Sequence, residues 1–310
     1  MGSQKLYFRP LPQTGPAKTG AAFQLAGGWC WFDSVEIMRR GGSTSVVAAQ
    51  EIPAEILSAL TASRADCCDL SMDRPRIMGI VNVTPDSFSD GGSFLAADAG
   101  IAHGRKLVSD GADILDIGGE STRPGAETVE IDDECDRVVP VIEGLLRACD
   151  NSPISIDTRK APVARAALKA GAGLINDVTA FGYDPDMAPV AAQSGAEVCL
   201  MHIQGDPATM QLNPQFEDVV LDVYDALEAA VQRAEASGIE RKNILVDPGI
   251  GFGKTTDHNL ALLARLSIFH TLGCKVLLGA SRKRFIGEIG GVADAQARVS
   301  GSVAVALHAV

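Results

Sequence analysis

Seven short apolar runs alternate with helix-like patterns between residues 76 and 310, and this alternation constrains the fold more than any other feature. The apolar positions between residues 216 and 234 repeat at helical spacing, which is the clearest of the helix patterns. A glycine precedes most of the runs, as a helix C-cap precedes the next strand. These glycines are Gly111, Gly171, Gly195, Gly238 and Gly273. The runs that we expect to form strands are 77–82, 113–117, 154–157, 174–177, 198–202, 244–247 and 275–279.

Strands that alternate with helices predict an α/β protein built on one parallel sheet. A (β/α)₈ TIM barrel collects its active-site residues from the ends of many strands. A doubly wound sheet concentrates them at one switch point instead. Here polar residues stand at the end of nearly every expected strand, so we expect the barrel. They are Asn82, Glu120, Asp157, Asn176, Asp177, His202, Asp247 and Ser281.

Only seven strand patterns are present, and the sequence ends in an apolar helical stretch, residues 298–310. An eighth strand and helix would need more residues than remain. We therefore expect the last strand and helix of the barrel to be missing from this chain. The alternative is that the N-terminal region closes the sheet.

The first part of the chain differs from the rest, and we expect it to be an N-terminal extension, residues 1–74, packed on a barrel domain, residues 75–310. Residues 1–28 look loose because they are rich in proline, glycine and threonine. Residues 29–35 fit an edge strand, and residues 53–63 fit a short helix. Residues 66–74 are polar and turn-like, and no motif in the extension suggests chemistry.

Composition excludes several classes of function. An apolar content of 46% is that of a globular protein with a full core. The net charge of -12 argues against nucleic acid or an anionic membrane as the main partner, and no apolar run is long enough to span a membrane. The seven cysteines, among them the adjacent Cys67 and Cys68, show no paired metal-ligand spacing. We expect free thiols in a reducing cytoplasm.

The stretch from residue 244 to residue 254, ILVDPGIGFGK, carries the strongest chemical signal. Asp247 ends an apolar run, and its carboxylate can accept two hydrogen bonds from an amidine-like edge. The three glycines permit close backbone approach, and Lys254 suits a nearby phosphate. The spacing does not fit a P-loop, because Pro248 stands where that motif needs glycine. A simpler interpretation, that the glycines only make a tight turn, explains Asp247 and Lys254 less well.

Two polar loops follow the first two expected strands. In NVTPDSFSDGG, the carbonyl oxygen of Asn82 could bind a hard cation, and Phe88 could cover an aromatic substrate. An ordinary turn with Asx and Ser caps would explain part of this loop. In GGESTRPG, Arg123 could bind an anion, and a solvated loop arginine is an equally simple interpretation.

The third and fourth expected strands end in Asp157 and Asn176-Asp177. Asp157 and Asn176 offer an acceptor and a mixed donor–acceptor that could read a heterocycle, or either could cap a helix. Asp177 fits a cap better, so we leave it out of the site. His202 has no partner in sequence, and we expect a structural role for it.

The seventh expected strand leads into Ser281-Arg282-Lys283-Arg284. Three consecutive cations in a chain of net charge -12 indicate an anionic substrate.

These segments together resemble the dihydropteroate synthase family. NVTPDSFSDGG, GGESTRPG, SIDT, INDV, DPGIGFGK and GASRKRFIG occur in the family's order, and the resemblance runs from about Arg76 to Val310. It implies a (β/α)₈ barrel that joins 4-aminobenzoate to 6-hydroxymethyl-7,8-dihydropterin diphosphate and releases pyrophosphate with Mg²⁺. It also implies small-molecule substrates and a homodimer, without nucleic acid or membrane partners.

The resemblance carries over position by position. It implies a catalytic set of Asp86, Asp157, Asp247 and Lys283. It implies substrate contacts from Phe88, Thr122, Arg123, Pro124, Asn176, Phe252, Lys254, Ser281 and Arg282. It implies that Asn82 helps to hold Mg²⁺. The family also ends in a strand that carries Arg-Val-His, and this chain stops before such a strand.

Two alternatives stay open. A related pterin-binding barrel that transfers a methyl group to a corrinoid protein would share Asp247 and Asn176, but it would not need the STRPG loop or the SRKR cluster. A non-catalytic pterin-binding fragment is the other alternative.

Overall fold

The computed structural model describes residues 5–17, 20–84, 92–121, 127–149, 152–205 and 209–309. Seven parallel strands form one sheet in the order β12-β11-β10-β9-β8-β7-β6, so each strand lies beside its neighbour in the chain. The strands are β6 (Met78–Asn82), β7 (Ile114–Gly118), β8 (Ile154–Asp157), β9 (Leu174–Asp177), β10 (Glu197–Met201), β11 (Ile244–Asp247) and β12 (Lys275–Val276). All seven predicted strands are confirmed.

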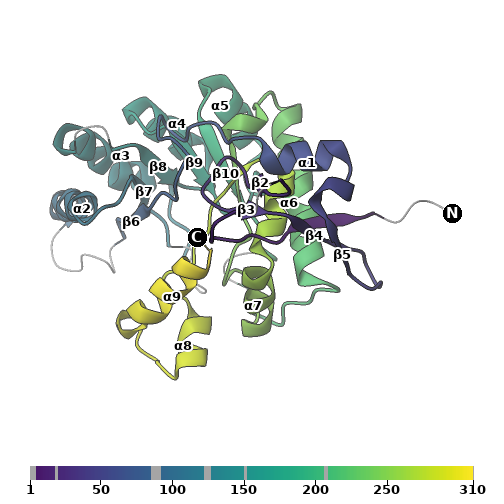
Figure 1. The fold of residues 1–310 in the computed structure, drawn as a ribbon. Helices are drawn as coiled ribbons and strands as arrows, with labels where there is room; N and C mark the ends of the chain where they lie inside the picture. The colour runs from purple at the N-terminus through teal and green to yellow at the C-terminus, as the bar shows by residue number, and fades with distance from the viewer. Residues whose placement is uncertain are drawn as a thin grey trace.

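Helices cover the outer face of this sheet, which curls as part of a barrel (Figure 1). The α-helices of the barrel domain are α2 (Gly92–Ser109), α3 (Ile131–Ala148), α4 (Ala161–Ala170), α5 (Met187–Ser194), α6 (Val219–Ala236), α7 (Thr256–Ala264), α8 (Arg284–Gly290) and α9 (Val299–Ala309). Short 3₁₀ helices are η3 (Arg241–Asn243), η4 (Leu266–Leu272) and η5 (Gln296–Arg298). The predicted α/β class and partial (β/α)₈ barrel are confirmed.

The predicted strand run 275–279 is shorter than expected, because only Lys275 and Val276 are paired as β12. This strand ends the order and has one neighbour, β11, in the sheet that the structure describes. The amide of Leu277 still donates to the carbonyl of Val246 at 2.9 Å. The backbone therefore follows β11 a little further and brings Gly279 to the carboxyl edge.

The glycines that precede the strands have the left-handed backbone conformation that only glycine adopts without strain. Gly171, for example, closes α4 with a φ of 113°, and its amide caps the helix. Gly195 and Gly273 end α5 and η4 in the same way. The predicted role of these residues as helix C-caps is confirmed.

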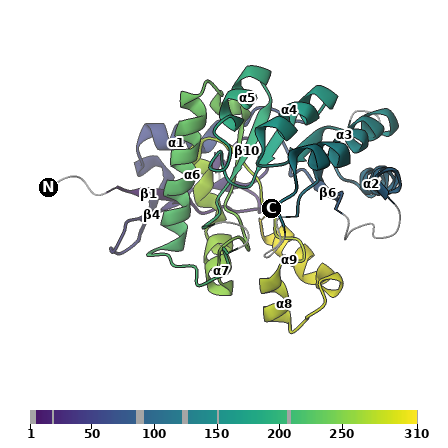
Figure 2. The same ribbon diagram turned by 180° about the vertical axis from the view of Figure 1, so that it is seen from behind.

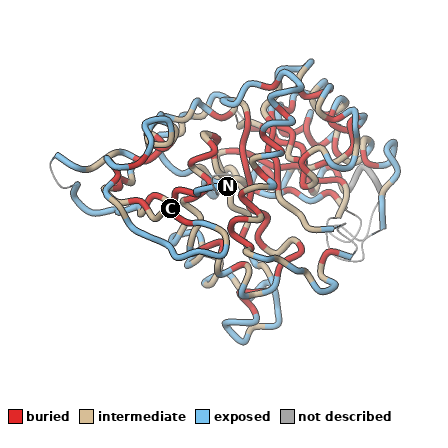
Figure 3. Tube along the Cα trace, turned by 90° about the vertical axis from the view of Figure 1, so that its right-hand side faces the viewer, coloured by how far each residue is buried: buried red, intermediate tan, exposed pale blue. Residues whose placement is uncertain are grey.

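The main core lies between the sheet and the helices and includes Ile156, Leu200 and Val246, none of which is exposed. Figure 3 shows that buried segments gather in the interior and exposed segments lie at the periphery. A smaller core fills the inner face of the sheet, where Leu174, Cys199 and Leu245 pack against Cys67. Residues 66–74, which were expected to be only polar and turn-like, therefore contribute to the core of the barrel.

The N-terminal residues are folded rather than loose. An antiparallel sheet contains β1 (Tyr7–Pro10), β4 (Ser34–Met38) and β5 (Ser45–Ala48) in the order β1-β4-β5. A second pair is β2 (Phe23–Gln24) with β3 (Trp31–Phe32), and η1 (Ala49–Glu51) and α1 (Ala54–Thr61) follow. The predicted helix at 53–63 is confirmed. For the described residues 5–17 and 20–28, the prediction of a loose segment is wrong, because Phe8 and Leu25 pack with Phe32 and Leu60 in a separate core.

This N-terminal unit lies beside α6 in both ribbon views (Figures 1 and 2). The Tyr7 hydroxyl donates to Asp225 at 2.8 Å, and Arg40 forms ion pairs with Asp222 and Asp225 at 2.5 and 2.7 Å. Arg64 donates to the carbonyl of Cys274 at 3.0 Å. The boundary at residue 74 remains a prediction. Among the described residues, no helix has both the length and the apolar character needed to cross a membrane.

Candidate active site

Strand register brings the polar strand ends together at one edge of the sheet. Asn82 pairs with Gly118, Gly118 with Asp157, and Asp157 with Asn176. A Cβ placed on Gly118 would lie 3.4 Å from Asn82 Oδ1 and 3.5 Å from Asp157 Oδ2. Glycine at this position therefore leaves room over which an amide oxygen and a carboxylate oxygen converge.

A buried carboxyl group, further inside the sheet, holds the Asn176 side chain in place. Asp116, inside β7, is 5% exposed, and its Oδ2 accepts a hydrogen bond of 2.9 Å from Asn176 Nδ2. Burial raises the pKa of Asp116, while the hydrogen bond from Asn176 acts in the opposite direction. Burial and the charge of Asp116 together raise the pKa of Asp157 well above its ordinary value. Asp116 and Asp157 therefore lie close enough to influence each other's charge, beside the Asn176 amide.

Sequence reasoning overlooked Asp116. The available signal was a single charged residue within an otherwise apolar strand, ILDIG. Since successive side chains of a strand alternate between its two faces, Asp116 and Gly118 share a face. A buried acid that shares a face with the candidate site is itself a candidate for a functional role.

Asp247 lies at the end of β11 and is 5% exposed. Its Oδ1 accepts a hydrogen bond of 2.7 Å from the amide of Gly249. A Cβ on Gly279 would lie 3.7 Å from Asp247 Oδ2 and 3.6 Å from Lys283 Nζ. Burial raises the pKa of Asp247, and the Lys283 ammonium is the largest influence against that rise. A carboxylate and an ammonium therefore face the same space above Gly279.

Lys283 occupies the other side of this space. Its Nζ donates to the carbonyl of Ile250 and lies 4.6 Å from the centre of the Phe252 ring. Burial lowers the pKa of Lys283 to about 8, while Asp247 favours the charged form. Lys283 thus presents a cation between a carboxylate and an aromatic ring.

The three cations after the seventh strand do not act as one patch. Lys283 turns inward, whereas Arg284 forms an ion pair with Glu288 at 3.0 Å on the surface of α8. Ser281 and Arg282 are exposed at the turn, and the amide of Arg282 donates to Ser302 Oγ at 2.8 Å. The interpretation of the cluster as a single anion-binding surface is corrected, because the start of α8 directs neighbouring side chains apart.

Lys254 is buried, with an exposed fraction of 2%, and its predicted contact with the substrate stays a prediction. Its Nζ lies 2.9 Å from His202 Nδ1, 3.3 Å from the His202 carbonyl and 2.9 Å from the Phe252 carbonyl. Burial lowers the pKa of Lys254 to about 7 and the pKa of His202 to about 3. Lys254 therefore joins the glycine turn to the end of β10, and His202 has a partner that sequence spacing did not reveal.

The glycine turn is shaped by the backbone of the neighbouring strand end. Gly249 has a φ of 67°, and a Cβ there would lie 1.9 Å from the His202 carbonyl oxygen. A Cβ on Gly253 would lie 2.7 Å from the Gln204 carbonyl oxygen. Gly249 and Gly253 are thus needed because a side chain at either position would clash with the segment after β10. This agrees with the simpler interpretation that the glycines make a tight turn.

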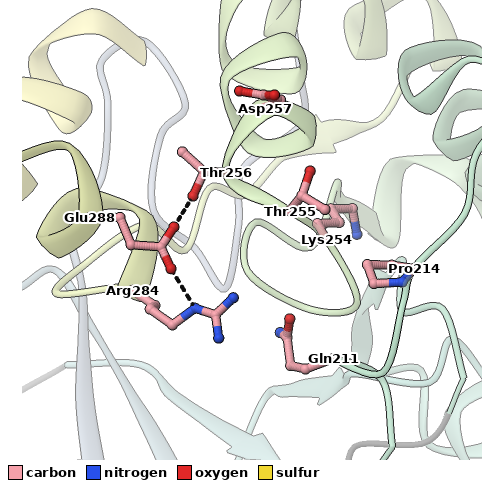
Figure 4. Close-up of a pocket in the computed structure, with 8 residues that line it drawn as sticks. All are labelled: Gln211, Pro214, Lys254, Thr255, Thr256, Asp257, Arg284 and Glu288. Atoms are coloured by element: carbon pink, nitrogen blue, oxygen red, sulfur yellow. Dashed lines mark hydrogen bonds and ion pairs between the residues drawn. The ribbon is translucent and has the colours of Figure 1, made fainter.

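A surface cavity beside this turn is shown in Figure 4. Glu288 faces Thr256 and Arg284 there, while Gln211 donates to the carbonyl of Gly251 at 2.7 Å. The cavity is lined by Gln211, Pro214, Lys254, Thr255, Thr256, Asp257, Arg284 and Glu288. Its mixed charges contrast with the single ammonium and carboxylate above Gly279.

A buried ionic network supports the segment after β7. Lys160 Nζ lies 2.5 Å from Glu120 Oε2, 2.5 Å from Glu134 Oε2 and 2.6 Å from the Val129 carbonyl. Arg159 pairs with Glu120 Oε1 at 2.9 Å. Because Val129 also donates to Glu120 at 2.9 Å, the two flanks of residues 122–126 are held against each other.

Several predicted site residues lie outside the described residues, and their roles stay predictions. They are Asp86, Phe88, Thr122, Arg123 and Pro124. Asp177 accepts hydrogen bonds from the amides of Thr179 and Phe181, each at 2.8 Å, so it orders the turn after β9. Its omission from the site agrees with these contacts.

Known proteins resemble this chain closely. The family described as pterin binding enzyme matches residues 78–310. The dihydropteroate synthase of Escherichia coli strain K12 is 44% identical over 240 residues, which cover 77% of this chain and 84% of that protein. The structure of Xanthomonas albilineans dihydropteroate synthase with 4-aminobenzoic acid is 50% identical, covers 79% of this chain and 88% of that one, and has a TM-score of 0.74.

A second Xanthomonas albilineans structure, in complex with 7,8-dihydropteroate, is 47% identical with a TM-score of 0.71. It covers 79% of this chain and 88% of that one. Both the family match and these relatives span well over half of the chain. The chain therefore belongs to the pterin binding enzymes, and within them to the dihydropteroate synthases.

Proposed function

We propose that this chain condenses 6-hydroxymethyl-7,8-dihydropterin diphosphate with 4-aminobenzoate to give 7,8-dihydropteroate and pyrophosphate. The observation that carries the proposal is the convergence of Asp247 and Lys283 on the space above Gly279, 3.7 and 3.6 Å from a Cβ there. A carboxylate beside an ammonium complements a ring edge that offers both donors and acceptors. The relatives named dihydropteroate synthase support the same reaction.

The pterin would lie between Asp247 and the Asp157–Asn176 edge. The Asp247 carboxylate would accept from the amino group and ring N–H of the pterin, as a charged acceptor binds paired donors strongly. Asn176 donates one N–H to Asp116, so its carbonyl oxygen and second N–H remain for the ligand. Asp116 is thereby a positioning residue for Asn176.

The 4-aminobenzoate would lie on the side of Phe252 and Lys283. The half-buried Phe252 ring offers an apolar face, and the Lys283 ammonium lies 4.6 Å from its centre. Ser281 and Arg282 are exposed near this wall and would contact the carboxylate of the substrate. Thr122, Arg123 and Pro124, together with Phe88 and Asp86, would complete the substrate contacts.

Asn82 and Asp157 would hold Mg²⁺. Their side-chain oxygens converge over Gly118, 3.4 and 3.5 Å from a Cβ there. Amide and carboxylate oxygens are the donors that Mg²⁺ prefers, and Mg²⁺ usually keeps several waters beside one or two such ligands. When bound, the ion would neutralise charge on the diphosphate and make it a better leaving group.

The reaction would proceed by breaking the C–O bond between the exocyclic methylene and the diphosphate. Both electrons of that bond leave with pyrophosphate, and the positive charge on the methylene spreads into the pterin ring. The carboxyl groups at 247 and 157 would stabilise that charge electrostatically. The arylamine nitrogen then forms the new C–N bond and loses a proton to solvent, without a covalent enzyme intermediate.

The test is Mg²⁺-dependent pyrophosphate release with and without 4-aminobenzoate. Release that requires 4-aminobenzoate and yields dihydropteroate supports the proposal, and Asp247→Ala should abolish it. Pterin binding without any turnover would instead identify a binding module. Methyl transfer from a methylated folate to a corrinoid would reassign the chain to the related barrel.

Two accompanying proposals concern the state of the protein rather than its chemistry. We propose a homodimer, which light scattering of the purified chain would test through its molar mass. We also propose a cytoplasmic location, because we expect the seven cysteines to be free thiols, as they are in a reducing compartment. Fractionation of expressing cells would test the second.

A further inference from the structure

A cluster of two thiols and one carboxyl group lies at the opposite end of the sheet from the proposed active site. The side-chain ligand atoms of Cys67, Cys68 and Glu197 lie within 4.8 Å of one another. Glu197 is the first residue of β10, whereas Asp247 and Asp157 are the last residues of their strands. The cluster therefore has no part in the chemistry proposed above.

A tight turn places the two cysteines. The amides and carbonyls of Cys67 and Leu70 exchange hydrogen bonds of 2.8 Å in both directions. The two residues between them, Cys68 and Asp69, have φ values of 46° and 64°. Such values are unusual outside glycine and asparagine. They define a two-residue turn in which both central residues have left-handed backbone conformations. The turn brings Cys68 beside Cys67 instead of pointing it away.

Glu197 is fixed against the same turn. Its Oε1 accepts a hydrogen bond of 2.6 Å from the Cys68 amide, and its Oε2 forms an ion pair with Lys275 Nζ. Cys67 is 7% exposed, while Cys68 and Glu197 are half-buried. An ion could therefore enter from the Cys68 side, and solvent could supply a further ligand there.

The donor set selects the type of ion. Two thiolates with one carboxylate suit Zn²⁺ and other soft or borderline divalent cations, while Mg²⁺ prefers oxygen ligands alone. Zinc binds sulfur at about 2.3 Å and oxygen at about 2.0–2.2 Å, so its tetrahedral ligands lie about 3.5–3.8 Å apart. Small rotations of three side chains would close the cluster to that size.

Charge balance is also favourable. Two neutral thiols with Glu197 and Lys275 carry no net charge, and the exchange of two thiol protons for one divalent cation keeps the sum at zero. Burial of a net charge would be costly, but here neither state requires it. Lys275, whose side chain is 1% exposed, thus compensates the third anionic ligand.

We propose that Cys67, Cys68 and Glu197 form a binding site for a soft divalent cation of the zinc class. Bound metal joins the turn at 67–70 to the start of β10. It would thereby fasten the segment between the N-terminal unit and the barrel to the inner core.

Cobalt titration of the reduced full chain tests the site, because thiolate-bound Co²⁺ absorbs in the near ultraviolet. One equivalent should produce the charge-transfer band, Zn²⁺ should remove it, and Mg²⁺ should not. Cys68→Ser should lose the band, and Glu197→Gln should bind more weakly. Cys135→Ser, which alters a half-buried cysteine on α3, is the matched control and should keep it.

A second measurement needs no substitution. Alkylation of Cys68, followed by peptide mass spectrometry, should slow about 100-fold at a free Zn²⁺ concentration 100 times Kd. Cys135 should react at an unchanged rate. Absence of the band in the unaltered chain, its persistence in Cys68→Ser, or equal alkylation with and without Zn²⁺ would overturn the proposal.

Discussion

Gly279→Ala tests the proposed pterin position without altering any charged group. The added Cβ would lie 3.6 Å from Lys283 Nζ and 3.7 Å from Asp247 Oδ2, which are ordinary van der Waals distances. The backbone of Gly279 is not left-handed, so alanine fits the chain conformation. Replacement of glycine by alanine at a compatible position stabilises a protein by about 0.4–1 kcal/mol. The fold should therefore remain intact.

The methyl group would instead occupy space that the ligand needs. Overpacking of this size costs about 1–3 kcal/mol, which corresponds to roughly 5- to 150-fold weaker binding. Calorimetric titration with the pterin diphosphate should show this loss, and urea unfolding should show unchanged or higher stability. Gly290→Ala, at an exposed position near the end of α8, is the matched control, because its Cβ would lie 3.8 Å from Val292 Cγ2. Wild-type affinity in Gly279→Ala, with the fold intact, would refute the placement of the pterin above Gly279.

Three further predictions concern charge. Asp247→Asn removes a charged acceptor, and a loss of about 1.5–3 kcal/mol in pterin binding is expected; a titration that finds less than about threefold weakening would contradict this role. Burial lowers the pKa of Lys283 to about 8, so ligand affinity should fall as the pH rises through that value. Lys283→Arg should retain its affinity to higher pH. An affinity of the unaltered chain that does not change with pH would reject a role of charged Lys283 in binding. Lys160→Met leaves Glu120 and the 1% exposed Glu134 without their shared cation, so unfolding free energy should drop by about 3–5 kcal/mol. An unchanged urea midpoint, with the exposed-pair variant Lys106→Met as the control, would show that the network is not needed.

Sequence alone determined the alternating architecture and the edge of the sheet at which the candidate site lies. Apolar runs and the glycines before them are local signals, because a helix cap and a buried strand are each specified by neighbouring residues. Parallel strands point their carboxyl ends to one side, so Asp157, Asn176 and Asp247 could be assigned to one site before their distances were known. The N-terminal sheet was missed because its strands are short and its core forms between distant residues such as Phe8 and Leu60.

Only the tertiary structure decided which polar groups meet. Lys254 and His202 are 52 residues apart, and their contact arises because the glycine turn passes the end of β10. Asp116 on β7 supports Asn176 on β9 across the one intervening strand, β8. Glu197 reaches the Cys67–Cys68 turn from another part of the chain. Such pairings depend on strand register and chain crossing. No local sequence pattern specifies strand register or chain crossing. Residue types therefore predicted the kind of chemistry, whereas the fold determined which residues contact each other.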